Sequence, residues 1–378
     1  MKQLRIGIDV RYLSHGLVGG VHTYETYFVP ALISLAKNQQ IFLYADTKQP
    51  FELSDLRSNV TVRYLPWRNG LSSIKNDWSM RQIMGQDQLD VVHFPANYGF
   101  GPKNARIVIT LHDEINIMPW VKIMSGHPKK ARTLATMTYL HFCSLAALKQ
   151  AALILTVSDY ARCQIAHYGR LNPEKIISIP HAAPPDLKKI ESSTILNEVR
   201  ARLGIQGPFI LADAIKNPAV LLDAWKQLSP DLRSGRKIVF FSRRPDPPQE
   251  VLRAVEEGTA QLLVRPNRAD LIALYNMAEV FVFPSKIEGF GLPLLESMTC
   301  GTPIIASNRG SIPEVAGDAA FLIDAEDSNA LAGYLTLLLT APAEAQRLRD
   351  LGARRAAQFS WSRTAQKILD SYQLALAA

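Results

Sequence analysis

The chain has 378 residues, more than a single hydrophobic core usually serves, so we expect two domains. Hydrophobic residues make up 47% of the chain and charged residues 20%, which excludes a largely disordered or collagen-like protein. The net charge of +8 comes from the first half, because residues 1–190 carry 22 basic and 13 acidic side chains (+9), whereas residues 191–378 carry 20 and 21 (−1).

The basic first half has two interpretations. A solvated surface is the simpler one, and the other is contact with a polyanion or an anionic membrane surface through Lys122, Lys129 and Lys130. Nucleic acid is not an expected partner, because no nucleic-acid-binding motif accompanies the charge. No stretch reaches the roughly 18–20 apolar residues of a membrane span, and no signal-peptide pattern precedes the first strand. We expect a cytoplasmic protein, either free or peripheral on the inner face of the membrane.

The cysteines argue against two kinds of structural cross-link. Cys143, Cys163 and Cys300 are far apart and include no CxxC pair, so neither a disulfide framework nor a structural zinc site is expected. All three are interpreted as small buried hydrophobic residues.

Short apolar, β-branched runs alternate with helical patterns along nearly the whole chain, which predicts βαβ units and parallel sheets. The strands expected in the first half are residues 4–10, 41–45, 60–65, 91–94, 107–111, 153–157 and 176–179. Those expected in the second half are residues 209–212, 238–241, 261–264, 280–283 and 303–306. Between the two series, the segment 181–189 (HAAPPDLKK) breaks the pattern. We place the domains at residues 1–182 and 183–359.

Loops that follow strands carry the candidate functional residues, because ligands of open parallel sheets bind beyond the carboxyl ends of the strands. After the first strand comes the segment 16–21 (GLVGGV), ahead of a helical pattern at residues 22–36. Gly19 and Gly20 allow backbone N–H groups to approach an anion at a helix N-terminus, although a flexible turn is an equal interpretation. The segment is not GxGxxG, which disfavours a nicotinamide-dependent dehydrogenase.

Three histidines are expected at strand ends. His112 is followed by two carboxylates, and His93 and His181 occupy comparable positions. No short-spaced pair of metal ligands accompanies them and no Asp-x-Asp pair is present, so we predict no metal site. Any phosphate charge must then meet cationic side chains and helix ends.

The second half offers such cations after two strands. Lys216 precedes a helical pattern at residues 221–228, and Arg243 and Arg244 follow the next strand. A lysine there can meet a phosphate as a point charge, and a solvated side chain is the alternative for each of the three.

The segment 283–296 (FPSKIEGFGLPLLE) is the most informative. A strand ends at Phe283, Glu288 lies in a loop with nearby glycines, and Pro293 and Glu296 are predicted in the first turn of a helix. Two carboxylates eight residues apart suit a sugar joined to a ribose through a diphosphate. The alternatives are a solvated Glu288 and a carboxylate that stabilises the helix N-terminus at Glu296. Farther along, Ser311 and Glu314 have capping-box spacing and are interpreted as structural.

Residues 288–327 resemble the signature of family 4 of the retaining, nucleotide-sugar-dependent glycosyltransferases, in which Glu288 and Glu296 match the Glu-x7-Glu motif. The resemblance extends over most of the chain through the segments GGVHTY, VITLHDE, LTVSDYAR, IISIP, KNP and FSWSRTAQKILDSY.

This resemblance implies the GT-B fold, an α/β architecture of two doubly wound Rossmann-like domains facing across a cleft, with a C-terminal helix at residues 360–378 packing back on the first domain. It implies a metal-independent retaining transferase that moves a hexose from a nucleoside diphosphate sugar to a hydroxyl of a glycan or lipid-linked glycan in polysaccharide biosynthesis. UDP-glucose is favoured as donor and GDP-mannose is next. The donor is a co-substrate, and no resident cofactor is expected. A nucleotide-sugar epimerase or a non-catalytic nucleotide-sugar-binding subunit is the alternative.

By the same resemblance the catalytic residues are His112 at the sugar, Glu288 at the donor hydroxyls and Lys216 at the phosphates. The first domain would take the acceptor and the second the donor. Residues expected to bind the donor are Gly19, Gly20, Arg243, Gly289, Phe290, Gly291, Leu292 and Glu296, the last at the ribose. Two features depart from the family pattern. The arginine usually found ahead of the lysine is missing, which suggests Arg243 or Arg244 as substitutes, and His181-Ala182 replaces an Asn-Gly pair.

Overall fold

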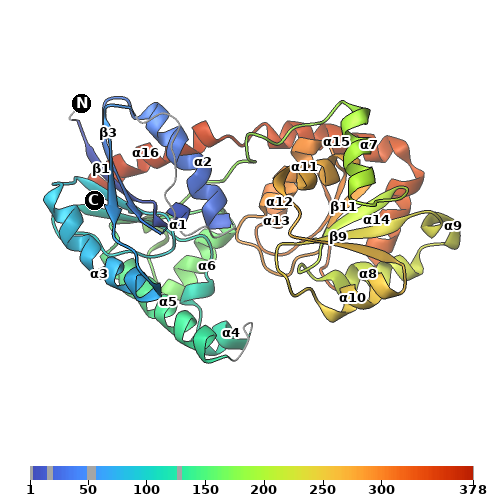
Figure 1. The fold of residues 1–378 in the computed structure, drawn as a ribbon, viewed down its shortest axis with the longest axis horizontal. Helices are drawn as coiled ribbons and strands as arrows, with labels where there is room; N and C mark the ends of the chain where they lie inside the picture. Colours follow the sequence, from blue (N-terminus) through green and yellow to red (C-terminus); the bar gives the residue numbers. More distant parts are fainter. Residues whose placement is uncertain (1–2, 15–19, 49–56, 126–129, 378) are drawn as a thin grey trace. The chain divides into compact units, whose positions relative to one another are not determined.

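A computed structural model describes residues 3–14, 20–48, 57–125 and 130–377. The chain divides into two compact units (Figure 1). The first consists of Met1–His181 and Ser360–Ala378, and the second of Ala182–Phe359. The division falls one residue before the boundary expected from the sequence. Among the described helices, none has both the length and the apolar character needed to cross a bilayer.

The first unit is built on a seven-stranded parallel sheet in the order β3-β2-β1-β4-β5-β6-β7. Its strands are mostly buried, except for the more exposed β3 and the end of β7, because helices cover both faces of a parallel sheet. Their bounds are β1 (Arg5–Asp9), β2 (Gln40–Asp46), β3 (Val60–Leu65), β4 (Val91–Phe94), β5 (Arg106–Thr110), β6 (Leu153–Thr156) and β7 (Ile176–Ser178). The strand order reverses between β1 and β4, which marks the place where such sheets bind ligands.

The helices of the first unit pack on both faces of this sheet. One face carries α3, α5 and α6, whose apolar side chains share a core with the strands, and α2 packs against α16. The bounds are α1 (Arg11–Ser14), α2 (Gly20–Leu35), α3 (Gly70–Gln86), α4 (Trp120–Ser125), α5 (Ala131–Gln150), α6 (Asp159–Gly169) and α16 (Trp361–Ala377), with 3-10 turns η1 (Ile115–Ile117) and η2 (Pro173–Lys175). The last helix thus returns to the first unit, as the resemblance implied.

The second unit has a six-stranded parallel sheet in the order β10-β9-β8-β11-β12-β13. Its switch point lies between β8 and β11. The bounds are β8 (Phe209–Asp213), β9 (Lys237–Ser242), β10 (Ala260–Val264), β11 (Val280–Phe283), β12 (Ile304–Ser307) and β13 (Phe321–Ile323). The sequence did not predict β13, because three residues are too short to show a strand pattern.

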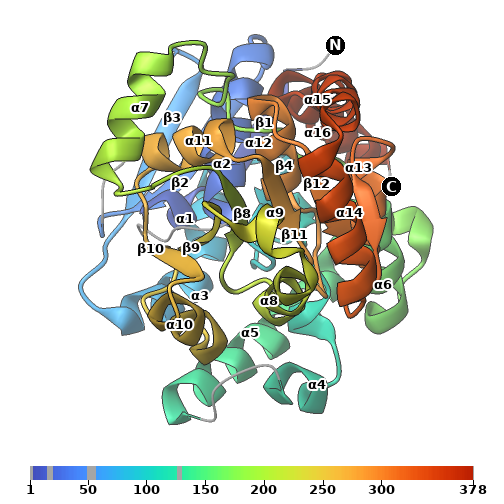
Figure 2. The same ribbon diagram turned by 90° about the vertical axis from the view of Figure 1, so that its right-hand side faces the viewer.

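Helices cover both faces of the second sheet, as Figure 2 shows with α8 and α10 on one side of β8 and β9 and α11 and α12 on the other. The core on the first side joins α8, α10, α14 and α15 to the strands. The bounds are α7 (Ser193–Arg202), α8 (Pro218–Gln227), α9 (Pro230–Arg233), α10 (Gln249–Glu256), α11 (Arg268–Met277), α12 (Leu292–Cys300), α13 (Ile312–Ala316), α14 (Ser328–Thr340) and α15 (Pro342–Ala356). Two doubly wound parallel sheets confirm the predicted fold class.

Candidate functional site

The candidate site of the second unit lies at the carboxyl ends of β8, β9 and β11. These strands are neighbours in the sheet, with β8 in the middle. Lys216 follows β8, Arg243 follows β9 and Glu288 follows β11. Residues from three separate segments are therefore brought to one edge of the sheet, beside the switch point.

Lys216 and Glu288 form an ion pair. The Nζ atom of Lys216 is 2.5 Å from Oε1 of Glu288, and the same oxygen accepts a hydrogen bond of 3.0 Å from the Ser285 hydroxyl. The side chain of Glu288 is 13% exposed and that of Lys216 is 29% exposed, so both charges are mostly shielded from water. The structure thus joins two of the predicted catalytic residues in one polar cluster.

The loop that carries Glu288 is fixed by its backbone. The carbonyl of Glu288 accepts hydrogen bonds from the Ser311 backbone N–H at 3.2 Å and from the Ser311 hydroxyl at 3.1 Å. Gly310 has a φ of +62°, and a Cβ there would lie 2.7 Å from the same carbonyl oxygen, so only glycine fits. The predicted capping box is wrong, because the Ser311 hydroxyl binds this carbonyl and makes no cap hydrogen bond to α13.

The remaining predicted residues of this loop lead into α12. Gly291 precedes the helix with a φ of +92°, a conformation that side chains disfavour, and Leu292 is the first helical residue. Phe290 is buried, and its ring lies edge-on to Phe359 with 6.0 Å between centroids. Gly289 completes the loop beside Glu288.

Glu296 lies deeper than the sequence suggested. Because α12 begins at Leu292, Glu296 belongs to the second helical turn, and its predicted place in the first turn is wrong. Its side chain is 3% exposed. Oε1 accepts a hydrogen bond of 3.2 Å from Arg268, and Oε2 accepts one of 3.1 Å from the Tyr275 hydroxyl. Arg243 lies 3.7 Å from Oε2. Two guanidinium groups, and not the helix N-terminus, balance this carboxylate.

Arg268 is a site residue that the sequence reasoning missed. It is the first residue of α11, shortly after β10, and it donates two hydrogen bonds of 2.9 and 3.0 Å to the carboxylate of Asp186. Burial opposes its charge, but Asp186 and Glu296 raise the pKa of Arg268 above its usual value. Its position after a parallel strand was the one signal that could have found it.

Asp213 ends β8, close to where the family pattern has an arginine. It is 5% exposed, and burial raises its pKa, while a hydrogen bond from the Ile215 N–H and the charges of Arg243 and Lys216 act in the opposite direction. Arg243 thus interacts electrostatically with both Asp213 and Glu296. The guanidinium of Arg243 therefore lies close to two buried carboxylates.

His112 lies after β5 in the first unit and is 9% exposed. Its Nε2 atom is 2.8 Å from the Pro95 carbonyl oxygen, which can only accept, so Nε2 carries the proton. Burial lowers the pKa of His112 to about 4, although the hydrogen bond to Pro95 opposes this shift. The imidazole is therefore neutral near pH 7.

The other two histidines of the prediction are buried. His93 lies inside β4 and not at its end, and its ring nitrogens are 2.8 Å from the Tyr372 hydroxyl and 2.7 Å from the Thr110 hydroxyl. It therefore joins the sheet to α16. His181 packs against Tyr24, with ring centroids 4.8 Å apart, and 5.5 Å from His112.

Two further expectations concern metals and the first glycines. No group of three or more histidine, cysteine, aspartate or glutamate side chains suited to a metal ion occurs within the described ranges. Gly20 opens α2, whereas Gly19 lies outside the described residues.

Comparison with known proteins agrees with this architecture. A family model described as "Glycosyltransferase Family 4" matches residues 18–187, and one described as "Glycosyl transferases group 1" matches residues 212–355. The solved structure of sucrose-phosphate synthase from Thermosynechococcus elongatus superposes with a TM-score of 0.71 at 18% identity, covering 99% of this chain and 100% of that one. The fold is that of the GT-B glycosyltransferases.

Two curated relatives have similar sequences. The O-antigen chain mannosyltransferase B of Escherichia coli is 29% identical over 79% of this chain and 76% of its own. The MMP alpha-(1->4)-mannosyltransferase of Mycolicibacterium hassiacum is 27% identical over 98% of this chain and 95% of its own. With one family model on each unit, the chain belongs to the family 4 glycosyltransferases.

Proposed function

We propose that this glycosyltransferase is a metal-independent hexosyltransferase that uses a nucleoside diphosphate sugar and retains the anomeric configuration. The observation that supports this most directly is the set of charged groups after β8, β9 and β11. Lys216 and Arg243 supply positive charge at the edge of the sheet, and Glu288 and Glu296 supply hydrogen-bond acceptors beside them.

Each part of the donor would contact the side chains whose chemistry suits it. The diphosphate suits Lys216 and Arg243, because cationic groups form strong hydrogen bonds with phosphate oxygens. Glu288 suits the hydroxyls of the donor sugar, because its carboxylate is more exposed to solvent than that of Glu296. Glu296 suits the ribose, since its oxygens can accept hydrogen bonds in addition to those from Arg268 and Tyr275.

Transfer would proceed on one face of the donor sugar. The bond from C1 to the β-phosphate oxygen breaks, the acceptor oxygen bonds to C1, and the departing phosphate oxygen takes the acceptor proton. The negative charge that develops on the diphosphate is stabilised by Lys216 and Arg243, an electrostatic contribution that requires no protein nucleophile. His112, neutral near pH 7, would hydrogen-bond the sugar.

The identity of the sugar is the second part of the proposal. The sequence favoured UDP-glucose over GDP-mannose, whereas the two relatives named above are mannosyltransferases. We therefore put GDP-mannose beside UDP-glucose as a donor candidate, with a glycan or lipid-linked glycan as acceptor. The enzyme would glycosylate such acceptors in the cytoplasm or at the inner face of the membrane.

The test is a donor panel with the full chain. UDP, GDP, ADP and their glucose and mannose conjugates are compared by thermal shift, because a ligand at about 100 times its Kd stabilises a protein by roughly 2.7 kcal/mol. The best donor is then incubated with neutral oligosaccharides, and the product is analysed by NMR. An α-linked product from an α-linked donor is expected. A β-linked product, or a free epimerised sugar without transfer, would overturn the proposal.

A further inference from the structure

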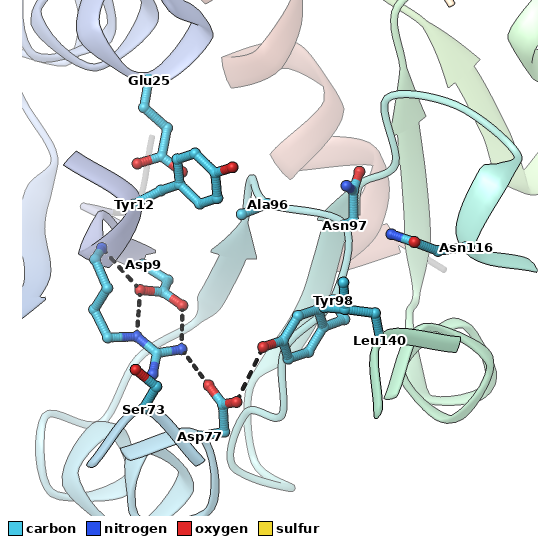
Figure 3. A pocket seen from close by; sticks show the side chains of 11 residues that line it. Asp9, Tyr12, Glu25, Ser73, Asp77, Ala96, Asn97, Tyr98, Asn116 and Leu140 are labelled. Atoms are coloured by element: carbon cyan, nitrogen blue, oxygen red, sulfur yellow. Dashed lines mark hydrogen bonds and ion pairs between the residues drawn. The ribbon is translucent and has the colours of Figure 1, made fainter. Parts of the chain in front are cut away.

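The two sheets hold a cation near their switch points in different ways. In the first unit, Arg11 donates hydrogen bonds of 2.9 and 2.8 Å to the carboxylate of Asp9 and lies 2.8 Å from Asp77, so two carboxylates enclose its guanidinium (Figure 3). In the second unit, Lys216 pairs with Glu288 and its side chain is 29% exposed. A lysine has a long and flexible stem, so an ion pair at a partly exposed ammonium does not by itself fix the position of the charge.

The backbone on both sides of Lys216 is held in place. Its loop runs from Asp213, the last residue of β8, to Pro218, the first residue of α8. The carboxylate of Asp213 accepts a hydrogen bond of 3.0 Å from the Ile215 N–H, and the carbonyl of Asp213 accepts one of 3.2 Å from the Lys216 N–H. On the other side stands Asn217, with a φ of +54° and a ψ of +55°. This left-handed conformation is uncommon for a residue with a side chain, and asparagine tolerates it better than most.

The side chain of Asn217 is turned away from the helix that it precedes. An asparagine at an N-cap usually accepts a hydrogen bond from the backbone of its helix, but Asn217 makes no such bond to the described residues of α8. Its Nδ2 atom instead donates hydrogen bonds of 3.1 Å to the Pro284 carbonyl and 2.6 Å to the Ala325 carbonyl. Pro284 directly follows β11, and Ala325 follows β13. One amide group therefore joins the segments that come after β8, β11 and β13.

The Pro284 carbonyl lies at the start of the loop that carries Glu288. The next residue, Ser285, donates a hydrogen bond of 3.0 Å to Oε1 of Glu288, the oxygen that also contacts Lys216. The amide of Asn217 thus binds the backbone directly before the residue that orients the Glu288 carboxylate. Asn217 is also the neighbour of Lys216 in the chain. Both members of the ion pair are therefore anchored through this one residue.

We infer that Asn217 is a positioning residue for glycosyl transfer, which acts by holding the Lys216 ammonium against Glu288. The inference rests on the proposed role of Lys216 at the donor diphosphate. The left-handed backbone sets the direction in which the Lys216 side chain leaves its loop, and the amide sets the distance between the loops after β8 and β11. A purely structural amide would stabilise the second unit without affecting the rate of transfer, so kinetic measurements distinguish the two roles.

Two substitutions separate the amide from the backbone. Asn217→Gly keeps the left-handed conformation, which glycine adopts freely, and removes both hydrogen bonds. Asn217→Ala removes the bonds and also opposes the conformation. The matched control is Asn59→Gly in the first unit, because the Asn59 amide also joins two carbonyls, those of Ala36 at 3.1 Å and Gln39 at 2.7 Å. Each variant of the full chain is made alone and together with Lys216→Met, and kcat, donor KM and Tm are measured, with rates taken well below the lowest Tm.

We expect Asn217→Gly to lower kcat by about 10- to 100-fold and to change donor KM by less than about threefold, because a displacement of about 1 Å at a reacting centre can cost about 100-fold in rate. Asn217→Ala should lose at least as much. Asn59→Gly should lower Tm and leave kcat unchanged. Together with Lys216→Met, Asn217→Gly should cost no more than about twofold in kcat, because residues that act as a unit have non-additive effects.

Three results would overturn the inference. They are a wild-type kcat in Asn217→Gly, an equal loss of kcat from Asn217→Gly with and without Lys216→Met, and a loss of kcat in Asn59→Gly as large as that in Asn217→Gly. Each of these leaves the proposed role of Lys216 standing, provided that Lys216→Met alone lowers kcat. A wild-type kcat in Lys216→Met would overturn both proposals, so the two failures are told apart by this single variant.

Discussion

Lys216 Nζ and Glu288 Oε1 lie 2.5 Å apart at the adjacent ends of β8 and β11. An ammonium group has three donors, and the carboxylate takes one of them, so the others remain for phosphate oxygens. Glu288 is also held by Ser285, whose hydroxyl donates a hydrogen bond to the same oxygen, Oε1. The pair therefore positions the two charges that the proposed reaction needs before a donor binds.

Replacing Lys216 with Met should lower kcat by about 100- to 1000-fold, the range found when one group that stabilises developing charge is removed. Donor affinity should fall less than kcat, because the charge on the diphosphate grows during transfer. The matched control is Lys226→Met, an exposed lysine of α8 that pairs with Asp223. Steady-state kinetics measure both parameters. A Lys216→Met enzyme with unchanged kcat would remove Lys216 from the mechanism.

Replacing Glu296 with Gln should weaken nucleotide binding, since a charged hydrogen bond is worth about 1.5–3 kcal/mol and the amide keeps the shape. The structure adds a second effect, because Arg268 and Arg243 lose their common counter-charge. Isothermal titration with the best nucleotide measures the first effect, and Tm measures the second. Combining Glu296→Gln with Arg268→Met gives a double-mutant cycle. If the glutamine variant binds nucleotide as tightly as wild type, the ribose role is wrong.

Acidification should destabilise the first unit through His112. Its folded pKa of about 4 lies below the unfolded value of about 6.5, so the unfolded chain binds the proton first. Its contribution to stability is complete above pH 6.5 and is lost as the pH falls towards 4, roughly 2 kcal/mol by pH 5. Urea unfolding at pH 7.5 and pH 5 measures this, and His112→Asn should show a smaller loss. Equal losses in both proteins would contradict the shift.

EDTA should leave turnover intact, because we assign the diphosphate charge to Lys216 and Arg243 and not to a divalent cation. Initial rates are measured with the best donor before and after chelation, and again after adding magnesium or manganese. Activity that disappears with EDTA and returns with either metal would reject this assignment. A matched sample with calcium-loaded EDTA controls for effects of the chelator itself.

Membrane contact by the basic first half should depend on salt. Reversing Lys129 and Lys130 to Glu should weaken binding to vesicles of anionic lipid, and added salt should weaken wild-type binding, since the Debye length is about 8 Å at physiological ionic strength. Lys130 is the exposed residue that precedes α5, and Lys129 lies outside the described residues. Co-sedimentation measures binding, with neutral vesicles as control. Equal sedimentation of both proteins would favour the solvated surface.

The sequence located almost all of the strands because their β-branched runs are buried on both faces of parallel sheets. It also located the loop of Glu288, since the glycines there reflect a local conformation. The sequence did not reveal contacts between residues that are far apart along the chain. Nothing in the sequence near Glu296 indicates that Arg268, 28 residues away, and Asp186, 82 residues from Arg268, complete one ion-pair network.

Local motifs were also ambiguous where tertiary contacts compete. Ser311 has the spacing of a capping residue, yet its hydroxyl binds the Glu288 carbonyl, because the loop after β11 lies beside it. The sequence pattern placed His93 at the end of a strand. In the structure its ring is hydrogen-bonded to Tyr372 of α16, a helix far away in the sequence. The ion pair between Arg11 of α1 and Asp77 of α3 was missed for the same reason, because the two residues are far apart in the sequence.

The return of α16 to the first unit has a consequence for biosynthesis. Tyr372 of α16 supplies a buried hydroxyl to His93 and packs within the first unit, so that unit lacks part of its core until α16 has left the ribosome. The second unit is complete by Phe359. Because domains fold as units during synthesis, the second unit can reach its native packing first. The first unit, although most of it is synthesised earlier, completes its packing only when α16 has been added.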